Sequence, residues 1–175
     1  MKKVGDIILG NIAYINAFRT LSSLEVGFII VLPPYQRTHV SSHMIGLAMQ
    51  YALDSPKDGG LGVRRVQWQA HASNAPSVRA GKRLGFRMEG VIRSVCNLFL
   101  VPRLASSLVY PHVSKLTLSK CRWQRPLPAG KESSEPFRAD DELGLPGRHT
   151  AVLSVCWDDW EGGVKEHVRS LIERV

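Results

Sequence analysis

Apolar and polar positions along the first 93 residues predict an ordered series of strands and helices. Residues 4–15 are rich in β-branched side chains and predict a strand, followed by a polar connection over residues 16–23. Residues 24–32 form an almost continuous apolar run, which is typical of a strand buried on both faces. Pro33 and Pro34 end this strand, because neither residue can donate a hydrogen bond to a neighbouring strand.

A helix is predicted over residues 40–53, where apolar side chains recur every three to four positions. Either Ser41 or Ser42 is expected to cap its start, since serine side chains accept hydrogen bonds from the first free amides of a helix. Residues 54–62 contain proline and three glycines and predict a loop. A strand is expected to follow over residues 63–69.

A second helix is predicted over residues 76–84, with Asn74 or a residue near it as its cap and Gly85 as its terminator. Residues 87–93 predict another strand. Strands therefore alternate with helices, and this order implies a mixed α/β sheet.

Periodicity is lost after residue 93 and returns near the C-terminus. Residues 94–122 contain two prolines and show no sustained period, and residues 127–147 are rich in Pro, Gly, Ser and Glu and predict a disordered loop. A last strand is expected over residues 149–157. Two glycines separate it from a short helix predicted over residues 164–174.

Composition indicates an ordinary globular protein with one domain. The chain has 175 residues, of which 44% are hydrophobic and 22% charged. No apolar run reaches the roughly 18 residues that a membrane span requires, and the N-terminus lacks the apolar region of a signal peptide. The three cysteines are far apart, match no metal-binding spacing and predict a reducing, cytoplasmic location without a metal.

Positive charge is concentrated near the second helix. The net charge of the chain is +8, and seven Lys or Arg residues lie between positions 64 and 93, against the single acid Glu89. Such a patch attracts polyanions, either nucleic acid or the phosphates of a nucleotide cofactor. No motif with base-reading or base-stacking residues is present, so nucleic acid is the less favoured partner.

Three blocks of residues occur in a fixed order along the chain. The first block contains Asn74, Ser77, Leu84, Gly85, Phe86, Glu89, Gly90 and Arg93. The second block spans residues 25–38, and the third spans residues 147–160 and ends in Trp160. In order and spacing these blocks resemble the GNAT acetyltransferases, and more narrowly their ribosomal-protein-alanine acetyltransferase-like branch. The resemblance covers about residues 4–93 and 122–160.

The resemblance implies an α/β (α+β) fold with a mixed, mostly antiparallel sheet flanked by helices. It implies one domain over residues 1–175, with a core at 4–93 and 147–160 and a C-terminal helix at 161–175. Residues 94–146 are then an insertion and loop, and we expect residues 94–122 to be foreign sequence, such as a translated intron. The strand and two helices that open the family's fold have no counterpart ahead of residue 4.

The resemblance also implies acetyl-CoA as co-substrate, with its pantetheine arm beside a splayed central strand. The implied contacts are with Ile29, Ile30, Val31, Gln36, Arg37, Thr38, His39, Val40, Ser41, Asn74, Ser77 and Lys82. The loop from Gln36 to Ser41 would hold the pyrophosphate, and the backbone around Ile30 would polarise the thioester carbonyl. Asn74 is either a contact to the cofactor arm, a helix cap, or both.

Acetyl transfer to an amine needs a proton acceptor, because an alkylammonium ion is not nucleophilic. Glu25 and Glu89 are the candidate bases, although each is equally compatible with a structural role. Ser77 is a candidate donor to the departing thiolate, or else it bonds only its own helix turn.

Three functions are consistent with these patterns. The leading one is an N-acetyltransferase that moves an acetyl group from acetyl-CoA directly to a primary amine, either on a small molecule or at a protein N-terminus. The others are a catalytically inactive acetyl-CoA-binding or interaction module, and a basic nucleic-acid-binding protein.

Overall fold

The computed structural model describes residues 7–96 and 147–173. The chain divides into two compact units, one formed by residues 1–90 with 151–175 and the other by residues 91–150. Nearly all of the predicted segment 94–122, and the predicted loop 127–147 except its last residue, lie outside the described residues, so these interpretations stay predictions.

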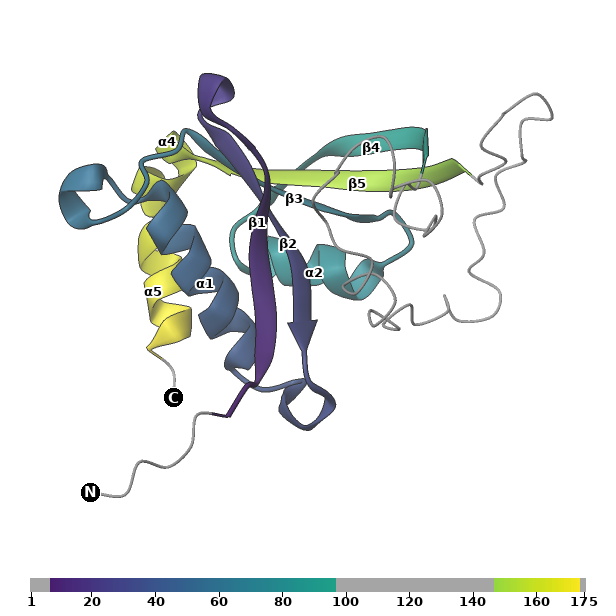
Figure 1. The fold of residues 1–175 in the computed structure, drawn as a ribbon, viewed down its shortest axis with the longest axis horizontal. Helices are drawn as coiled ribbons and strands as arrows, with labels where there is room; N and C mark the ends of the chain where they lie inside the picture. Colours follow the sequence, from purple (N-terminus) through teal and green to yellow (C-terminus); the bar gives the residue numbers. More distant parts are fainter. Residues whose placement is uncertain (1–6, 97–146, 174–175) are drawn as a thin grey trace, which may run out of the picture. The chain divides into compact units, whose positions relative to one another are not determined.

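Five strands form one sheet in the described part of the chain (Figure 1). They are β1 (Gly10–Phe18), β2 (Ser23–Val31), β3 (Arg65–His71), β4 (Arg87–Cys96) and β5 (Gly147–Cys156). Their order in the sheet is β1-β2-β3-β5-β4. The β1–β2 pair is antiparallel and the β2–β3 pair is parallel, so the sheet is mixed, as the alternating pattern predicted.

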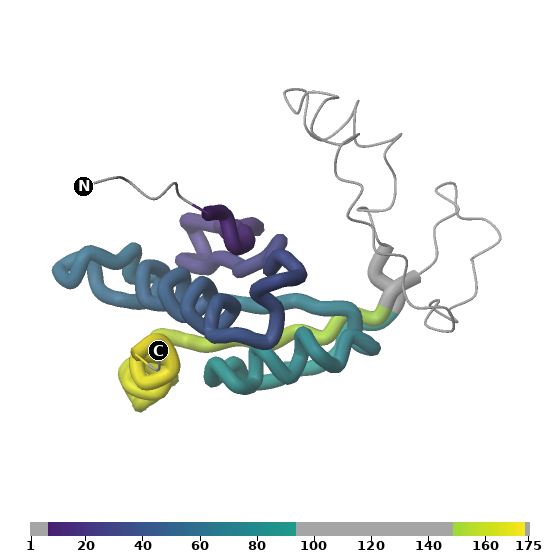
Figure 2. The backbone as a smooth tube through the Cα atoms, turned by 90° about the horizontal axis from the view of Figure 1, so that it is seen from below, coloured from purple at the N-terminus to yellow at the C-terminus, as the bar shows by residue number. Residues whose placement is uncertain are grey.

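Helices connect and flank these strands. The described helices are α1 (Val40–Leu53), α2 (Ala75–Arg83), α4 (Trp157–Asp159) and α5 (Lys165–Ile172), with short turns η1 (Arg19–Leu21), η2 (Pro33–Tyr35), η3 (Pro56–Asp58) and η5 (Trp160–Val164). Helix α1 is the crossover that parallel strands require, because a hairpin cannot join β2 to β3. Helices α1 and α5 lie side by side, as the ribbon and the tube both show (Figures 1 and 2). None of the described helices is long and apolar enough to cross a membrane.

Apolar side chains of the sheet and helices form a common core. In β3 every second residue is buried, and the ring of Trp68 meets that of Phe86 edge-on with 5.5 Å between centroids. Gly46 lets α1 approach α5 closely, since a Cβ there would lie 2.8 Å from a side-chain carbon of Ile172. Burial of such side chains stabilises the fold by about 1.5–3 kcal/mol each.

Several predicted boundaries differ from the observed ones. The first strand was expected at residues 4–15 but spans Gly10–Phe18, because Asn16 does not end it. Asn16 has a positive φ of 47° and lies at an irregularity of the β1–β2 register, so this polar residue forms a bulge within the strand. The last helix, expected over residues 164–174, spans Lys165–Ile172.

The predicted cap of α1 is wrong. The cap position is His39, and no side chain caps the helix, so neither Ser41 nor Ser42 has that role. Thr38, just before the helix, satisfies one amide at its start, since its Oγ1 accepts a hydrogen bond from the amide of Val40 over 3.3 Å. The serines lie inside the first turn, where their side chains are past the amides that need an acceptor.

Candidate functional site

Strands β2 and β3 run together for only three residues and then separate. Their paired positions are Ser23 with Arg65, Leu24 with Val66 and Glu25 with Gln67. Beyond Glu25, β2 continues to Val31 and stays paired only with β1 among the described strands. One edge of β2 therefore offers backbone groups to a ligand that carries amides, in the manner of strand addition.

A bulge lies in the separated part of β2. Phe28 has a positive φ of 48°, which is rare for an aromatic residue and which turns its peptide groups out of the regular pleat. The carbonyl of Phe28 accepts a hydrogen bond from the Asn11 side chain over 2.9 Å. The three predicted contact residues Ile29, Ile30 and Val31 follow this bulge and are partly exposed.

The loop after β2 is held by its own side chains. The Gln36 amide donates to the carbonyl of Val31 over 3.0 Å, and the Thr38 hydroxyl donates to the carbonyl of Tyr35 over 2.6 Å. Arg37 adopts a positive φ of 63° between them. These bonds fix the path from β2 into α1, and they connect the predicted residues Ile29–Val31 and Gln36–Ser41 into one structured segment.

Positive potential is available at the start of α1. No side chain caps the helix and its first turn holds no acidic residue, so the amides of Ser41 and Ser42 have no side-chain acceptor. Such a helix terminus favours an anion. The rings of His39 and His43 lie beside it, 4.7 Å apart between centroids.

The start of α2 is organised around Asn74 and Ser77. The Asn74 Oδ1 accepts from the amide of Ser77 over 3.3 Å, which confirms the predicted helix cap. The Ser77 Oγ accepts from the Trp68 indole over 3.0 Å, so its own hydrogen points elsewhere. Sequence reasoning missed Trp68, because its distance from Ser77 depends on how α2 packs on β3.

Both helices begin where parallel strands end. Helix α1 follows β2 and α2 follows β3, so both N-termini belong to the same edge of the sheet. A weak hydrogen bond of 3.4 Å from Arg83 to the Ser42 hydroxyl joins the end of α2 to the start of α1. Lys82, the remaining predicted contact, is exposed on α2.

Glu25 is a buried carboxylate at the point where β2 leaves β3. Its exposed fraction is 5%, and its Oε2 accepts from the Asn16 side chain over 2.8 Å. Asn16 reaches it because Ile15, the residue before it in β1, is paired with Glu25 of β2. Asn16 was not predicted, and only the β1–β2 register reveals it.

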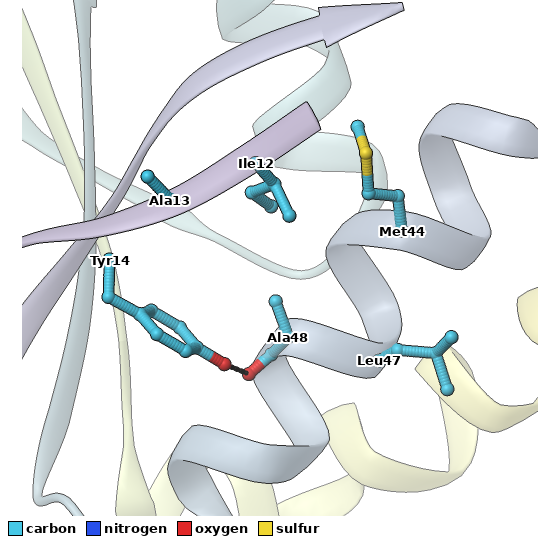
Figure 3. A pocket seen from close by; sticks show the side chains of 6 residues that line it. All are labelled: Ile12, Ala13, Tyr14, Met44, Leu47 and Ala48. Atoms are coloured by element: carbon cyan, nitrogen blue, oxygen red, sulfur yellow. Dashed lines mark hydrogen bonds between the residues drawn. The ribbon is translucent and has the colours of Figure 1, made fainter. Parts of the chain in front are cut away.

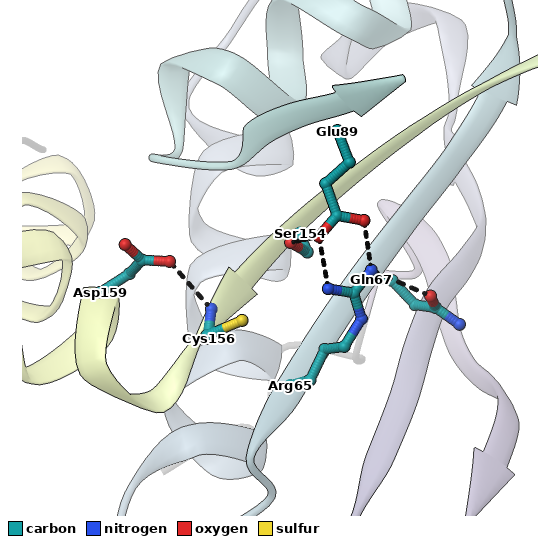
Figure 4. Close-up of polar contacts among 6 residues, drawn as sticks. All are labelled: Arg65, Gln67, Glu89, Ser154, Cys156 and Asp159. Carbon is teal, nitrogen blue, oxygen red and sulfur yellow. Dashed lines mark hydrogen bonds and ion pairs between the residues drawn. The ribbon is translucent and has the colours of Figure 1, made fainter. Parts of the chain in front are cut away.

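Glu89 belongs to a different network (Figure 4). Both of its carboxylate oxygens accept from Arg65 over 2.5 Å, and the Ser154 hydroxyl donates to it over 2.7 Å. The Arg65 hydrogen bonds, supported by Ser154, lower the pKa of Glu89 to about 2. Sequence reasoning missed Arg65, which lies 24 residues away, because pairing across a sheet leaves no local pattern.

One group of potential metal ligands occurs in the described residues. The ligand atoms of Cys156, Asp158 and Asp159 lie within 4.8 Å of one another. The Asp159 carboxylate already accepts from the Cys156 amide and pairs with Arg87. Its oxygens therefore stabilise the start of α4.

Known proteins resemble this chain in structure. No protein-family profile and no curated protein matches its sequence. A GCN5-related N-acetyltransferase from Brucella melitensis has a TM-score of 0.59 and 23% identity, covering 95% of this chain and 52% of that one. A probable GNAT-family acetyltransferase from Chromobacterium violaceum has a TM-score of 0.55 and 21% identity, and the match covers 91% of this chain and 55% of that one. A mutant spermidine N-acetyltransferase from Vibrio cholerae has a TM-score of 0.51 and 13% identity, and the match covers 87% of this chain and 60% of that one.

The chain thus spans a little more than half the length of these structural neighbours. At such identities the likeness concerns the fold. The expected mixed, mostly antiparallel sheet with flanking helices is confirmed. The described part of the chain has the fold of the GNAT acetyltransferases.

Proposed function

We propose that this chain binds acetyl-CoA and transfers its acetyl group to a primary amine. The observation that carries the proposal is the separation of β2 from β3 after Glu25, within a fold shared with acetyltransferases. A splayed parallel pair followed by two helix N-termini suits a long ligand that has amides at one end and phosphates at the other.

In this proposal the diphosphate lies against the loop from Gln36 to Ser41. The uncapped first turn of α1 supports it, since free amides and the helix dipole both favour an anion. The backbone from Ile29 to Val31 pairs with the amides of the cofactor arm. The side-chain amide nitrogen of Asn74 is a second contact, because the cap uses only its oxygen. Lys82, which is exposed on α2, would attract the remaining phosphate.

Acetyl-CoA would supply an activated acetyl thioester. Glu25 would accept the proton of the amine, directly or through a water, because it lies where the two strands separate and is buried beside Asn16. Ser77 would donate a hydrogen bond from its hydroxyl to the leaving thiolate, since its oxygen already accepts from Trp68. Glu89 has no part in this scheme, because a carboxylate with a pKa of about 2 is a weak base.

The test has two stages, binding and turnover. Calorimetric titration with acetyl-CoA is expected to show saturable binding, and release of free thiol in the presence of primary amines is expected to show transfer. Glu25→Gln is expected to lower turnover by about 10²–10⁴-fold with little change in acetyl-CoA affinity. Glu89→Gln is the matched control and should leave turnover nearly unchanged.

Each result has a defined meaning. No heat of binding at millimolar acetyl-CoA would contradict the proposal. Binding without turnover across small amines and peptide N-termini would support an inactive acetyl-CoA-binding module. Because the chain spans 52–60% of its structural neighbours, the acceptor has to be found by such a panel.

A further inference from the structure

The bulge in β2 comes from one extra residue relative to β1. The pairing of Ala13 with Gly27 is followed by that of Asn11 with Ile30. Two steps along β1 thus correspond to three along β2, and Phe28 lies within this interval with its φ of 48°. A residue other than glycine keeps this conformation only where neighbouring groups hold it, and such residues gather at functional sites.

The Asn11 side chain contacts this peptide directly. Its Nδ2 donates over 2.9 Å to the carbonyl oxygen of Phe28. Because β1 and β3 lie on opposite sides of β2 in the sheet, this bond turns the carbonyl towards β1. The peptide is trans, as are all those described, so the N–H of Ile29 points the opposite way from that carbonyl. The Ile29 N–H is therefore directed to the side on which β3 has separated from β2.

Strand β1 is itself fixed against α1 (Figure 3). The Tyr14 hydroxyl donates over 2.5 Å to the carbonyl of Ala48. Burial, and then the neighbouring Tyr51, raise the pKa of Tyr14 to about 12, so this donor keeps its proton at neutral pH. Apolar side chains of both elements line a depression of about 300 Å³, and they are Ile12, Ala13, Tyr14, Met44, Leu47 and Ala48. Asn11 thus belongs to a strand that is anchored to a helix.

The position of Ile29 relates its N–H to one end of the proposed ligand. In the proposed function the diphosphate lies beyond Val31, at residues 36–41, and Glu25 lies at the other end of the gap. Ile29 is the first of the proposed backbone contacts counted from Glu25, so its N–H is the one nearest to the thioester. A fixed N–H at that place stabilises the negative charge that develops on the thioester carbonyl oxygen during acetyl transfer.

We propose that Asn11 is a positioning residue for acetyl transfer, which holds the Ile29 N–H towards the thioester carbonyl through its hydrogen bond to Phe28. The inference rests on the proposed function, since it adds a residue to the same site. Asn11 itself touches neither substrate nor cofactor. It acts by keeping Phe28 in a conformation that regular extended backbone would otherwise replace.

Steady-state rates of thiol release from acetyl-CoA test this role in the full chain, with the primary amine that the unmodified chain acetylates fastest. Asn11→Ala is expected to lower kcat about tenfold or more and to change the KM for acetyl-CoA less than about twofold, because the N–H acts chiefly in the transition state. Asn11→Asp keeps the size of the side chain but lacks the N–H, and it is expected to behave like Asn11→Ala. Asn11 is exposed, so circular dichroism is expected to show an unchanged fold.

Phe28→Gly provides a rescue. Glycine adopts a positive φ without strain, so the bulge is expected to persist in Phe28→Gly without help from Asn11. The Phe28 side chain is 53% exposed, so its removal leaves the core filled. In the Phe28→Gly background, Asn11→Ala is therefore expected to lower kcat by less than about threefold. An unchanged kcat in Asn11→Ala alone, or a loss that persists in full in the Phe28→Gly background, would overturn the proposal.

Crystal structures without cofactor separate this inference from the proposed function. The peptide between Phe28 and Ile29 is expected to keep its orientation in the unmodified chain and to turn in Asn11→Ala, with a negative φ at Phe28. Absence of turnover by the unmodified chain would contradict the proposed function, and the two crystal structures would still decide whether Asn11 holds the peptide. The same orientation in both would overturn that role.

Discussion

At the scale of single residues, the carboxylates of Glu25 and Glu89 lie in different environments of the same sheet. Glu25 is enclosed and accepts from a neutral amide, Asn16. Glu89 instead accepts a bidentate pair of bonds from a guanidinium, that of Arg65. The sequence marked both as candidate bases, and the bidentate Arg65 contact to Glu89 is visible only in the structure; such a charged donor strongly stabilises the ionised form of Glu89.

The Arg65–Glu89 pair makes stability depend on pH. Glu89 has a folded-state pKa of about 2, below its ordinary value of 4.5, so its stabilising effect is complete above about pH 5 and is lost as the pH falls towards 2. Glu89→Gln is expected to lower stability near pH 7 by about 0.5–1 kcal/mol, since the pair is partly exposed. The difference in melting temperature between variant and unmodified chain should shrink on going from pH 6 to pH 2. A difference that stays constant over that range would contradict the assignment.

At the scale of elements, Asn74 has a role that can be separated into two parts. Asn74→Ala removes the cap of α2 and is expected to cost about 1 kcal/mol, measured by urea unfolding. Asn74→Asp keeps an oxygen at the cap and loses the side-chain N–H donors. It is therefore expected to unfold like the unmodified chain and yet to bind acetyl-CoA more weakly. If both variants bind as the unmodified chain does, Asn74 is a cap and nothing more.

Elements bounded by strong local signals were predictable from the sequence. The helix at residues 40–53 was predicted with its observed bounds, and Gly85 was identified as a terminator, where the structure gives it a positive φ of 91°. The hydrophobic pattern placed the end of the first strand too early, at Asn16, because in sequence a polar residue in a bulge cannot be distinguished from a polar residue in a turn. It also failed at the cap of α1, because a serine near a helix start does not reveal in which turn it lies.

The candidate site was predictable only in its local segments. The residues from Gln36 to Ser41 follow an apolar strand directly, so their position at a strand-to-helix junction was clear. The separation of β2 from β3 was expected only from the family resemblance. The residue where it begins depends on a register between positions about 40 residues apart, and the partners Asn16 and Trp68 depend on tertiary packing.

At the scale of the whole molecule, Trp160 joins distant parts of the chain. It is fully buried, and its indole donates over 2.9 Å to Asp54, 106 residues away at the end of α1. The same carboxylate pairs with Lys165 over 2.9 Å. The segment after β5 is thereby fastened to the segment after α1.

Loss of this connection is expected to destabilise the whole fold. Trp160→Phe leaves a void and removes one of the two donors to the Asp54 oxygen, at a cost of about 2–3 kcal/mol in urea unfolding. Trp157→Phe is the matched control, because Trp157 is 54% exposed and its replacement should cost less than about 0.5 kcal/mol. Equal effects of the two substitutions would show that Trp160 does not hold the segments together.

The order of the strands has a consequence for synthesis on the ribosome. Of the five described strands β5 is synthesised last, but it lies between β3 and β4, so β4 cannot join the sheet until β5 has left the exit tunnel. A nascent chain that ends before this point can assemble β1, β2 and β3 only, with the far side of β3 open. Strand β5 must therefore be synthesised before the described sheet can close.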